Sequence, residues 1–234
     1  ALDLLFPQLC IFCDGDRKGG GDFLCLSCRE DIAWLEPPFC HSCGMPAEID
    51  YDYPTPEFEC SLCRREPFRF DRARSLGYYQ SVLKQLIHHF KYAKQPGVMK
   101  EITQLIERFF GQSTEDWSGL YVSHVPLHFR KMRERGFDQS FLVAKQVAAT
   151  LGEPMAAGLL RRVVETPPQA KMSRGDRKKN VSGAFEVNRP DQVEGKKILL
   201  VDDVFTTGST VSEASKALKR AGAKEVFVFT LARA

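Results

Sequence analysis

The eight cysteines of this 234-residue chain all lie between positions 10 and 63, and each belongs to a C-x2-C pair. A C-x2-C turn presents two thiolates to one ion, and a second turn completes a tetrahedral shell. Disulfide bridges do not require such regular spacing, and a single C-x-x-C motif suffices for redox chemistry. The spacing therefore predicts two Zn²⁺ sites with four cysteine ligands each. The predicted ligands are Cys10, Cys13, Cys25, Cys28, Cys40, Cys43, Cys60 and Cys63.

The sequence leaves the pairing of these turns open. Sequential pairing gives C-x2-C-x11-C-x2-C and C-x2-C-x16-C-x2-C, which are zinc-ribbon spacings. Crossed pairing, first turn with third and second with fourth, uses the same ligands. His41 is a weaker candidate ligand, because four thiolates already satisfy the ion. Full shells exclude a catalytic water, so both ions are expected to be structural and to stabilise a segment too short to bury much core. Thiolate ligands also predict a cytoplasmic protein.

The chain from residue 67 onward alternates strand-like and helix-like patterns. Strands are expected at 72–79, 120–125, 197–201 and 226–231, and helices near 82–90, 98–109, 141–151 and 210–221. Asp138 and Gly152 are the expected caps of the third helix, and Gly222 is the expected C-cap of the fourth. Such alternation is typical of a doubly wound α/β sheet of parallel strands. The predicted organisation is a double zinc ribbon, 1–66, followed by an α/β domain, 67–234.

Bulk composition narrows the class of protein further. A hydrophobic content of 43% suffices for a packed globular core. The net charge of +3 is too small for a surface that coats nucleic acid without specificity. No stretch approaches about 20 consecutive apolar residues, so insertion into a membrane is not expected.

The stretch 199–210, which reads LLVDDVFTTGST, carries the clearest functional signal. A buried strand ends in Asp202 and Asp203, at the edge where open α/β sheets bind ligands. A helix N-terminus follows, and its free N–H groups and dipole attract a phosphate. Carboxylates repel phosphate, but they accept hydrogen bonds from a vicinal diol or help to hold a metal. The combination predicts a site for a phosphorylated ribose, with no Walker motif present. The predicted phosphate ligands are Thr206, Thr207, Gly208, Ser209 and Thr210.

Two basic elements accompany this loop. Four cations lie within six residues after the 120–125 strand, and they are predicted to clamp a pyrophosphate. A solvated basic loop is the alternative reading of this segment. The second element spans 161–179 and is interpreted either as a lid over the sugar or as a loop that faces nucleic acid. The four clustered cations are Arg130, Lys131, Arg133 and Arg135.

The motifs together resemble the ComF (GntX-like) family over essentially the whole chain. The resemblance is carried by the four C-x2-C pairs, Phe90-Lys91-Tyr92, the segments 125–128, 135–139 and 169–185, and the 199–210 loop. That loop is also similar to the signature of type I phosphoribosyltransferases, which binds phosphoribosyl pyrophosphate (PRPP). One departure is Asp138, where the family usually has Asn.

The resemblance implies a type I phosphoribosyltransferase fold behind the zinc ribbons. It implies that Asp202 and Asp203, the candidate catalytic residues, bind the ribose hydroxyls of PRPP, and that residues 206–210 wrap its 5-phosphate. Mg²⁺ is expected to accompany PRPP. The family further implies a link to DNA uptake in natural transformation, with single-stranded DNA and a helicase-like protein as partners. Transferase activity is implied only by analogy with the fold.

Two functions follow, and the sequence does not choose between them. The first is a catalytic phosphoribosyltransferase, in which Mg²⁺ and the basic segment stabilise the departing pyrophosphate. The second is a non-catalytic PRPP sensor or adaptor, in which the zinc ribbons dock single-stranded DNA or a protein. Pyrophosphate release with a panel of acceptors tests the first, and salt-dependent DNA binding tests the second.

Overall fold

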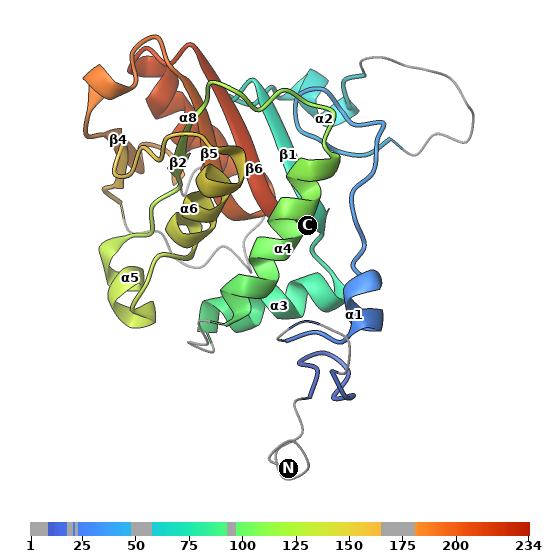
Figure 1. The fold of residues 1–234 in the computed structure, drawn as a ribbon. Helices are drawn as coiled ribbons and strands as arrows, with labels where there is room; N and C mark the ends of the chain where they lie inside the picture. The colour runs from blue at the N-terminus through green and yellow to red at the C-terminus, as the bar shows by residue number, and fades with distance from the viewer. Residues whose placement is uncertain (1–8, 18–20, 22, 48–57, 93–96, 165–180) are drawn as a thin grey trace.

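A computed structural model describes residues 9–17, 21, 23–47, 58–92, 97–164 and 181–234 (Figure 1). The N-terminal part contains two short helices, α1 (Leu26–Glu30) and α2 (Ser61–Arg65). Each helix starts directly after a cysteine, so its first turn carries the next cysteine of the same C-x2-C pair. Among the described residues, no helix is long and apolar enough to cross a membrane.

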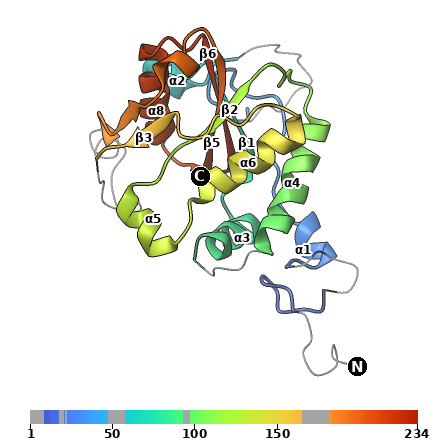
Figure 2. The ribbon, with the colours of Figure 1, turned by 60° about the vertical axis from the view of Figure 1, so that its left-hand side comes forward.

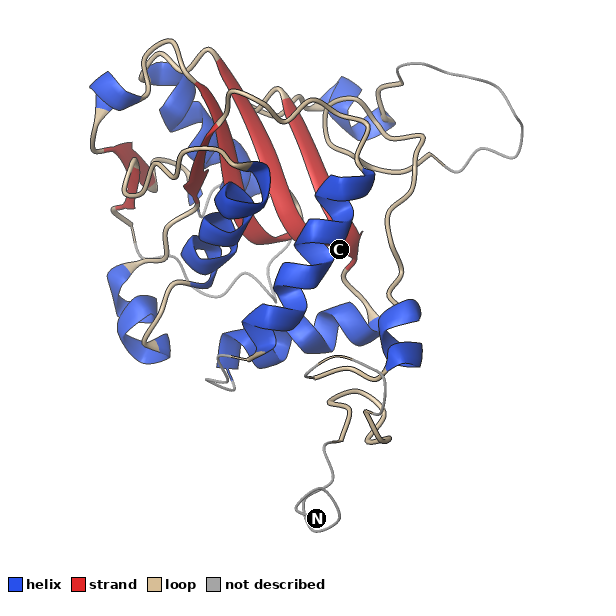
Figure 3. Cartoon of the chain, in the orientation of Figure 1, coloured by secondary structure: helices blue, strands red, loops and turns tan. Residues whose placement is uncertain are grey.

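The core of the chain is a four-stranded sheet of order β1-β6-β5-β2, in which all neighbours are parallel (Figure 3). Its strands are β1 (Arg72–Tyr78), β2 (Tyr121–His124), β5 (Lys197–Phe205) and β6 (Glu225–Arg233). Alternate side chains of β5 enter two different hydrophobic clusters. Leu199 and Val201 face one cluster, and Ile198 and Leu200 face the other. Helices cover both faces, which confirms the predicted α/β class with a parallel sheet.

Three helices cover one face and a fourth covers the other. On the first face lie α3 (Ser81–Tyr92), α4 (Val98–Gln112) and α6 (Gln139–Leu151), and α8 (Ser209–Arg220) lies on the second (Figure 1). The Asp138 side chain accepts a hydrogen bond from the N–H of Phe141, and Gly152 ends α6 in a left-handed conformation, as predicted. The C-cap of α8 is Ala221, one residue before the predicted Gly222.

Three features differ from the sequence-based expectation. The basic segment is a helix, α5 (Phe129–Arg135), and none of its residues is buried. A two-stranded antiparallel sheet forms from β3 (Leu160–Arg162) and β4 (Phe185–Val187), which are too short to give a recognisable pattern. A 3-10 turn, η2 (Pro190–Gln192), follows β4. Finally, β5 does not end at Val201 but continues through both aspartates, because β6 runs beside it as far as Arg233.

The cysteine-rich segment packs directly on the α/β domain. The N–H of Tyr78 donates to the carbonyl of Ala33 at 2.8 Å, and Trp34 forms an antiparallel bridge with Gly77 of β1. Arg29 forms an ion pair with Glu101, a buried side chain of α4. Each of the two hydrophobic clusters contains cysteines together with residues of the sheet and its helices. The two predicted domains, 1–66 and 67–234, therefore share their cores; the boundary between them stays a prediction.

Candidate functional site

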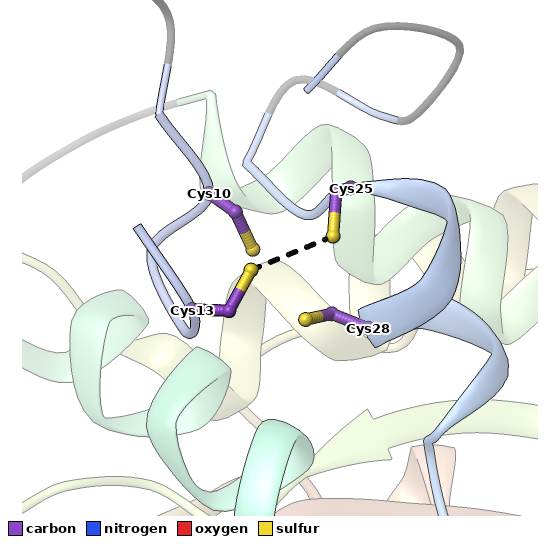
Figure 4. Close-up of side chains that lie close together, drawn as sticks. All are labelled: Cys10, Cys13, Cys25 and Cys28. Atoms are coloured by element: carbon purple, nitrogen blue, oxygen red, sulfur yellow. Dashed lines mark hydrogen bonds between the residues drawn. The ribbon is translucent and has the colours of Figure 1, made fainter. Parts of the chain in front are cut away.

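The first group of four thiols converges from two turns (Figure 4). Cys10, Cys13, Cys25 and Cys28 have all their Sγ atoms within 4.8 Å of one another, and Cys13 Sγ lies 3.7 Å from Cys25 Sγ. A disulfide requires about 2.05 Å. A tetrahedral ion with Zn–S bonds of about 2.3 Å separates its sulfurs by about 3.8 Å, so this spacing fits zinc. All eight cysteines of the chain are free thiols.

The second group has the same geometry. Cys40, Cys43, Cys60 and Cys63 also have their Sγ atoms within 4.8 Å of one another, with 3.8 Å between Cys40 and Cys63 and 3.7 Å between Cys43 and Cys60. The pairing is thus sequential, which settles the alternative that the sequence left open. His41 is not a member of the cluster. Two four-cysteine sites that fit structural Zn²⁺ are therefore present, as predicted.

The Cys25 thiol of the first site has a lowered pKa, which favours metal binding. The Ser27 hydroxyl lies 3.2 Å from Cys25 Sγ and is the main cause that lowers the pKa of this thiol to about 6. A thiolate is the form that ligates zinc, so a lowered pKa reduces the cost of deprotonation at neutral pH.

The two aspartates of β5 face a cavity of about 430 Å³ at the edge of the sheet. Asp203 Oδ2 accepts a hydrogen bond from Gln139 Nε2 at 2.9 Å and forms an ion pair with Lys91 Nζ at 2.9 Å. Asp202 Oδ1 accepts hydrogen bonds from Ser140 Oγ and from the N–H of Asp203, both at 2.9 Å. The start of α6 and the end of α3 thus hold the two carboxylates in different environments.

Burial and neighbouring charges shift the pKa values of Asp202 and Lys91. Burial, and then the neighbouring Asp203 charge, raise the pKa of Asp202 to about 7. Burial is the largest single effect on Lys91 and lowers its pKa, but the Asp203 charge, the hydrogen bond to Asp203 and the Asp202 charge together outweigh it, so that the pKa of the lysine is raised. Lys91 therefore stays a cation beside Asp203, and Asp202, with a pKa of about 7, changes protonation near neutral pH.

The loop between β5 and α8 divides its hydroxyl side chains between two cavities. Thr206 and Thr210 line the cavity of the aspartates. Thr207 and Ser209 line a second cavity of about 270 Å³, and their hydroxyls lie 2.9 Å apart. Gly208 is the N-cap of α8 and has φ +75°, which an L side chain adopts only with strain. Two of the predicted phosphate ligands, Thr206 and Thr210, thus line the same cavity as the acidic pair, whereas Thr207 and Ser209 line the other cavity.

Only some of the cations of the basic helix α5 face the cavity of the aspartates. Lys131 and Arg135 line the cavity of the aspartates, and Arg130 and Arg133 are not among its lining residues. The guanidinium of Arg135 lies over the ring of Tyr92, 5.1 Å from its centroid, and donates to its hydroxyl at 3.3 Å. The predicted anion clamp is therefore built from one side of α5 only.

Comparisons with known proteins identify the family. A double zinc ribbon model matches residues 1–65 and a phosphoribosyl transferase domain model matches 138–234. "Competence protein F" of Haemophilus influenzae is 32% identical over 98% of this chain and 98% of its own. This chain belongs to the ComF (GntX-like) family. The predicted fold, a type I phosphoribosyltransferase sheet behind a four-cysteine zinc-ribbon module, is thereby confirmed.

Other members of the ComF family are similar over nearly the whole chain. "DNA utilization protein YhgH" of Escherichia coli K12 is 30% identical over 98% of this chain and 99% of its own, and "Competence protein ComFC" of Bacillus subtilis is 26% identical over 90% and 84%. A solved glutamine phosphoribosylpyrophosphate amidotransferase from B. subtilis has 23% identity and a TM-score of 0.42, over 61% of this chain and 30% of its own.

The departure at Asp138 has a structural explanation in this ComF-family chain. One carboxylate oxygen caps α6 through the N–H of Phe141 at 3.1 Å, and the other accepts from the N–H of Leu127 at 3.0 Å. His124 Nε2 lies 3.9 Å away, and burial lowers the pKa of this histidine. Asp138 does not line the cavity of the aspartates, so its charge is used within the scaffold.

Four residues that line the cavity or contact its aspartates were not assigned to the site from the sequence. Lys91 and Gln139 lie within motifs that marked the family, but nothing local in the sequence places them beside Asp203. Ser140 is the first-turn residue of α6 that reaches Asp202. Arg162 of β3 also lines the cavity; burial lowers the pKa of its guanidinium, and the Asp202 charge opposes that effect. The remainder of the predicted 161–179 element, from 165 onward, lies outside the described residues.

Proposed function

We propose that this ComF-family protein binds PRPP in the cavity of the aspartates and acts as a phosphoribosyltransferase-like component of DNA uptake in the cytoplasm. The observation that carries the proposal is the shared cavity: Asp202, Asp203 and the two ends of the phosphate loop face the same space as four cations. Those cations are Lys91, Lys131, Arg135 and Arg162. A sugar diol beside two anionic groups is complementary to this cavity, because the diol donates to the carboxylates and the anionic groups accept from the cations and hydroxyls.

Each part of PRPP has residues suited to it. The ribose hydroxyls donate to Asp202 and Asp203, because carboxylates accept two such bonds. The 5-phosphate binds at the N-terminus of α8 beside Thr206 and Thr210, where N–H groups and the helix dipole favour an anion. The pyrophosphate lies against Lys131 and Arg135. Arg130 and Arg133 contribute long-range attraction from the outer side of α5.

Mg²⁺ fits the same cavity, since carboxylate oxygens and phosphate oxygens are its preferred ligands. The acidic pair would hold it together with PRPP, and the ion would neutralise charge on the departing pyrophosphate. Within the chain, Lys91 and Gln139 fix the orientation of Asp203, and Ser140 fixes that of Asp202. The protein therefore supplies a preorganised acceptor for the ribose before the substrate arrives.

PRPP binding is tested by titration calorimetry with and without Mg²⁺, on the wild type and on the double variant Asp202→Asn, Asp203→Asn. We expect binding that the double variant abolishes while zinc content stays at two ions per chain. Unchanged affinity in the variant would refute the assignment. Pyrophosphate release with a panel of acceptors then separates a transferase from a PRPP sensor without turnover.

A second function, an adaptor for single-stranded DNA, is favoured by the surface of α5. Tyr92, Phe129 and Met132 are exposed by 57%, 58% and 50%. Phe129 and Met132 lie among the four cations of α5, and Tyr92, at the end of α3, contacts Arg135. Exposed aromatic rings beside arginines are the chemistry that stacks unpaired bases and neutralises a phosphate backbone. We define this aromatic-basic surface by Tyr92 and the residues 129–135. It adjoins the cavity mouth, because Lys131 and Arg135 belong to both.

The names of the relatives are consistent with a function that involves DNA. Proteins similar over nearly the full length of the chain are called competence and DNA utilization proteins. A helicase-like partner would meet the chain outside the cavity, and the zinc ribbons are the proposed dock, as exposed apolar side chains such as Leu26 and Met45 lie there. Both functions use the same fold and do not exclude each other.

A further inference from the structure

We infer that the second four-cysteine site supports the phosphate loop through Arg233, which acts as a positioning residue between them. The effect on PRPP affinity rests on the proposed function, but the effect on the loop itself does not. Arg233 is the last residue of β6, and its side chain is only 4% exposed. A buried guanidinium at the end of a strand requires partners on more than one side.

On one side, the Arg233 guanidinium contacts Cys43 of the second four-cysteine site. Its Nη1 donates to the carbonyl of Cys43 at 2.6 Å, and its Nη2 donates to Cys43 Sγ at 3.5 Å. A zinc ion with four thiolates carries a net negative charge, so a cation that bonds one sulfur stabilises the shell and fixes the orientation of that ligand. Such outer-shell partners typically change metal affinity by about 10–100-fold when removed.

On its other side, the Arg233 guanidinium contacts Phe205, which lies at the start of the phosphate loop. Its guanidinium carbon lies 4.5 Å from the centroid of the Phe205 ring, within the range of a cation–π contact. Arg233 and Phe205 are also register partners in neighbouring strands, and the N–H of Ala234 donates to the carbonyl of Phe205 at 2.9 Å. Phe205 immediately precedes Thr206, so whatever holds its ring also holds the start of the loop.

The ring of Phe205 lies directly under Gly208. A Cβ at position 208 would come within 2.6 Å of both the Phe205 and Phe68 rings, so the loop backbone rests on these two aromatics. Phe68 stacks on Phe70 at 4.8 Å and meets Phe205 edge-on at 5.8 Å. Because Phe68 follows shortly after Cys63, two connections run from the second site to the same glycine.

Among the described residues, no such connection links the first four-cysteine site to the loop. Its buried cysteines pack in the cluster formed with α3 and α4, and none of them lines either cavity beside the loop. The two zinc sites therefore differ in role. The second site is coupled to the phosphate loop, whereas the first anchors the N-terminal segment to the helices.

The test compares Arg233→Met with Arg74→Met. Arg74 is a matched control: its side chain is also buried, and its Nη1 donates to the carbonyls of Cys40 and His41, but it does not contact Phe205. We expect Arg233→Met to release zinc about 10-fold faster to a chromogenic chelator. Hydrogen exchange of the 205–212 amides should also rise about 10-fold relative to the amides of α6. Arg74→Met should leave the loop exchange unchanged.

A second variant keeps the inference testable if Arg233→Met does not fold. Phe205→Leu retains a buried apolar side chain but removes the ring that joins Arg233 to Gly208. Loop exchange should rise with zinc release unchanged, because the contacts to Cys43 remain. Wild-type loop exchange in both variants, or in the one that folds, overturns the coupling. Where the wild type binds PRPP, loosened loops should also weaken its affinity; a wild type without PRPP binding refutes the proposed function and leaves the exchange result to decide the coupling.

Discussion

Lys91, at the end of α3, lies with its Nζ 2.9 Å from Oδ2 of Asp203, near the end of β5. The ion pair ties a helix that packs against the first zinc site to the acidic pair of the cavity. Gln139 donates to the same carboxylate oxygen. Asp203 is therefore fixed from two helices, and its lysine partner offsets part of the charge that two adjacent carboxylates would otherwise concentrate.

Replacing Lys91 with Met should destabilise the protein more at pH 8 than at pH 6. The Lys91 charge lowers the pKa of Asp202, which burial and the Asp203 charge raise to about 7. Without Lys91 the folded pKa of Asp202 rises further above its unfolded value, so more stability is lost as pH rises through the folded pKa. We expect a loss of about 3 kcal/mol at pH 8, measured by urea unfolding. Lys91→Arg keeps the charge and should lose less; equal losses of Lys91→Met at both pH values would contradict this account.

Asp202→Asn should stabilise the folded protein while it weakens ribose recognition. The pKa of Asp202 is raised to about 7, above its unfolded value, so the group costs stability increasingly as pH rises from about 4 to 7 and by a constant amount above that. The neutral amide removes this cost. We expect a gain of about 1–3 kcal/mol at pH 8 over wild type, and a smaller gain at pH 5.5. Urea unfolding at the two pH values measures it, and a gain independent of pH would count against the raised pKa.

Asp138→Asn tests whether this departure from the family serves the scaffold. Asp138 uses one oxygen for the N–H of Phe141 and the other for the N–H of Leu127. The amide has a single acceptor oxygen, so one of these bonds is lost. A modest loss of about 0.5–1 kcal/mol is expected for Asn and about 1–2 kcal/mol for Ala, which removes the cap. PRPP affinity should stay at the wild-type value for Asn; a tighter complex would show that the charge reaches the site.

The features predicted correctly from the sequence are those set by local spacing. The C-x2-C turns determine the two thiol clusters, and the apolar periodicity of α3 and α4 determines the face that each buries. The cap at Asp138 follows from its place before an apolar helix. The same reasoning found the β5 strand and the helix after it, because both lie within a continuous stretch of pattern.

The features that were missed depend on contacts between distant segments. Nothing near Lys91 indicates that its ammonium reaches Asp203. β5 extends through its two aspartates only because β6 supplies backbone partners there. The helix α5 buries no residue, so it has no apolar face for a periodicity to reveal. Likewise, the sequence does not show that Thr207 and Ser209 line a different cavity from Thr206 and Thr210.

Unfolding should be a single cooperative transition rather than two. Contacts such as Arg29–Glu101 and the Tyr78–Ala33 hydrogen bond join the cysteine-rich segment to the α/β domain, and both hydrophobic clusters cross the predicted boundary. Calorimetry should therefore give equal calorimetric and van't Hoff enthalpies. Removing zinc with a chelator should lower the stability of the whole chain. Two separable transitions would show that the segment 1–66 folds independently.

The aromatic-basic surface predicts how single-stranded DNA binds. Phe129→Ala removes an exposed ring from α5 and should weaken binding of an oligothymidine by about 1–3 kcal/mol, with little change in the salt dependence. Arg130→Gln removes a charge and should reduce the slope of log K against log salt by about 0.7, the value for one contact with a single strand. Neither residue lines the cavity, so PRPP affinity should be unaffected by Phe129→Ala and only slightly lowered by Arg130→Gln, which removes a long-range attraction. Leu26→Ala, on the zinc ribbon, is the matched exposed control. If Leu26→Ala weakens DNA binding while the α5 variants do not, the zinc ribbon carries the interface, because a stacking platform on α5 would lose affinity with its ring.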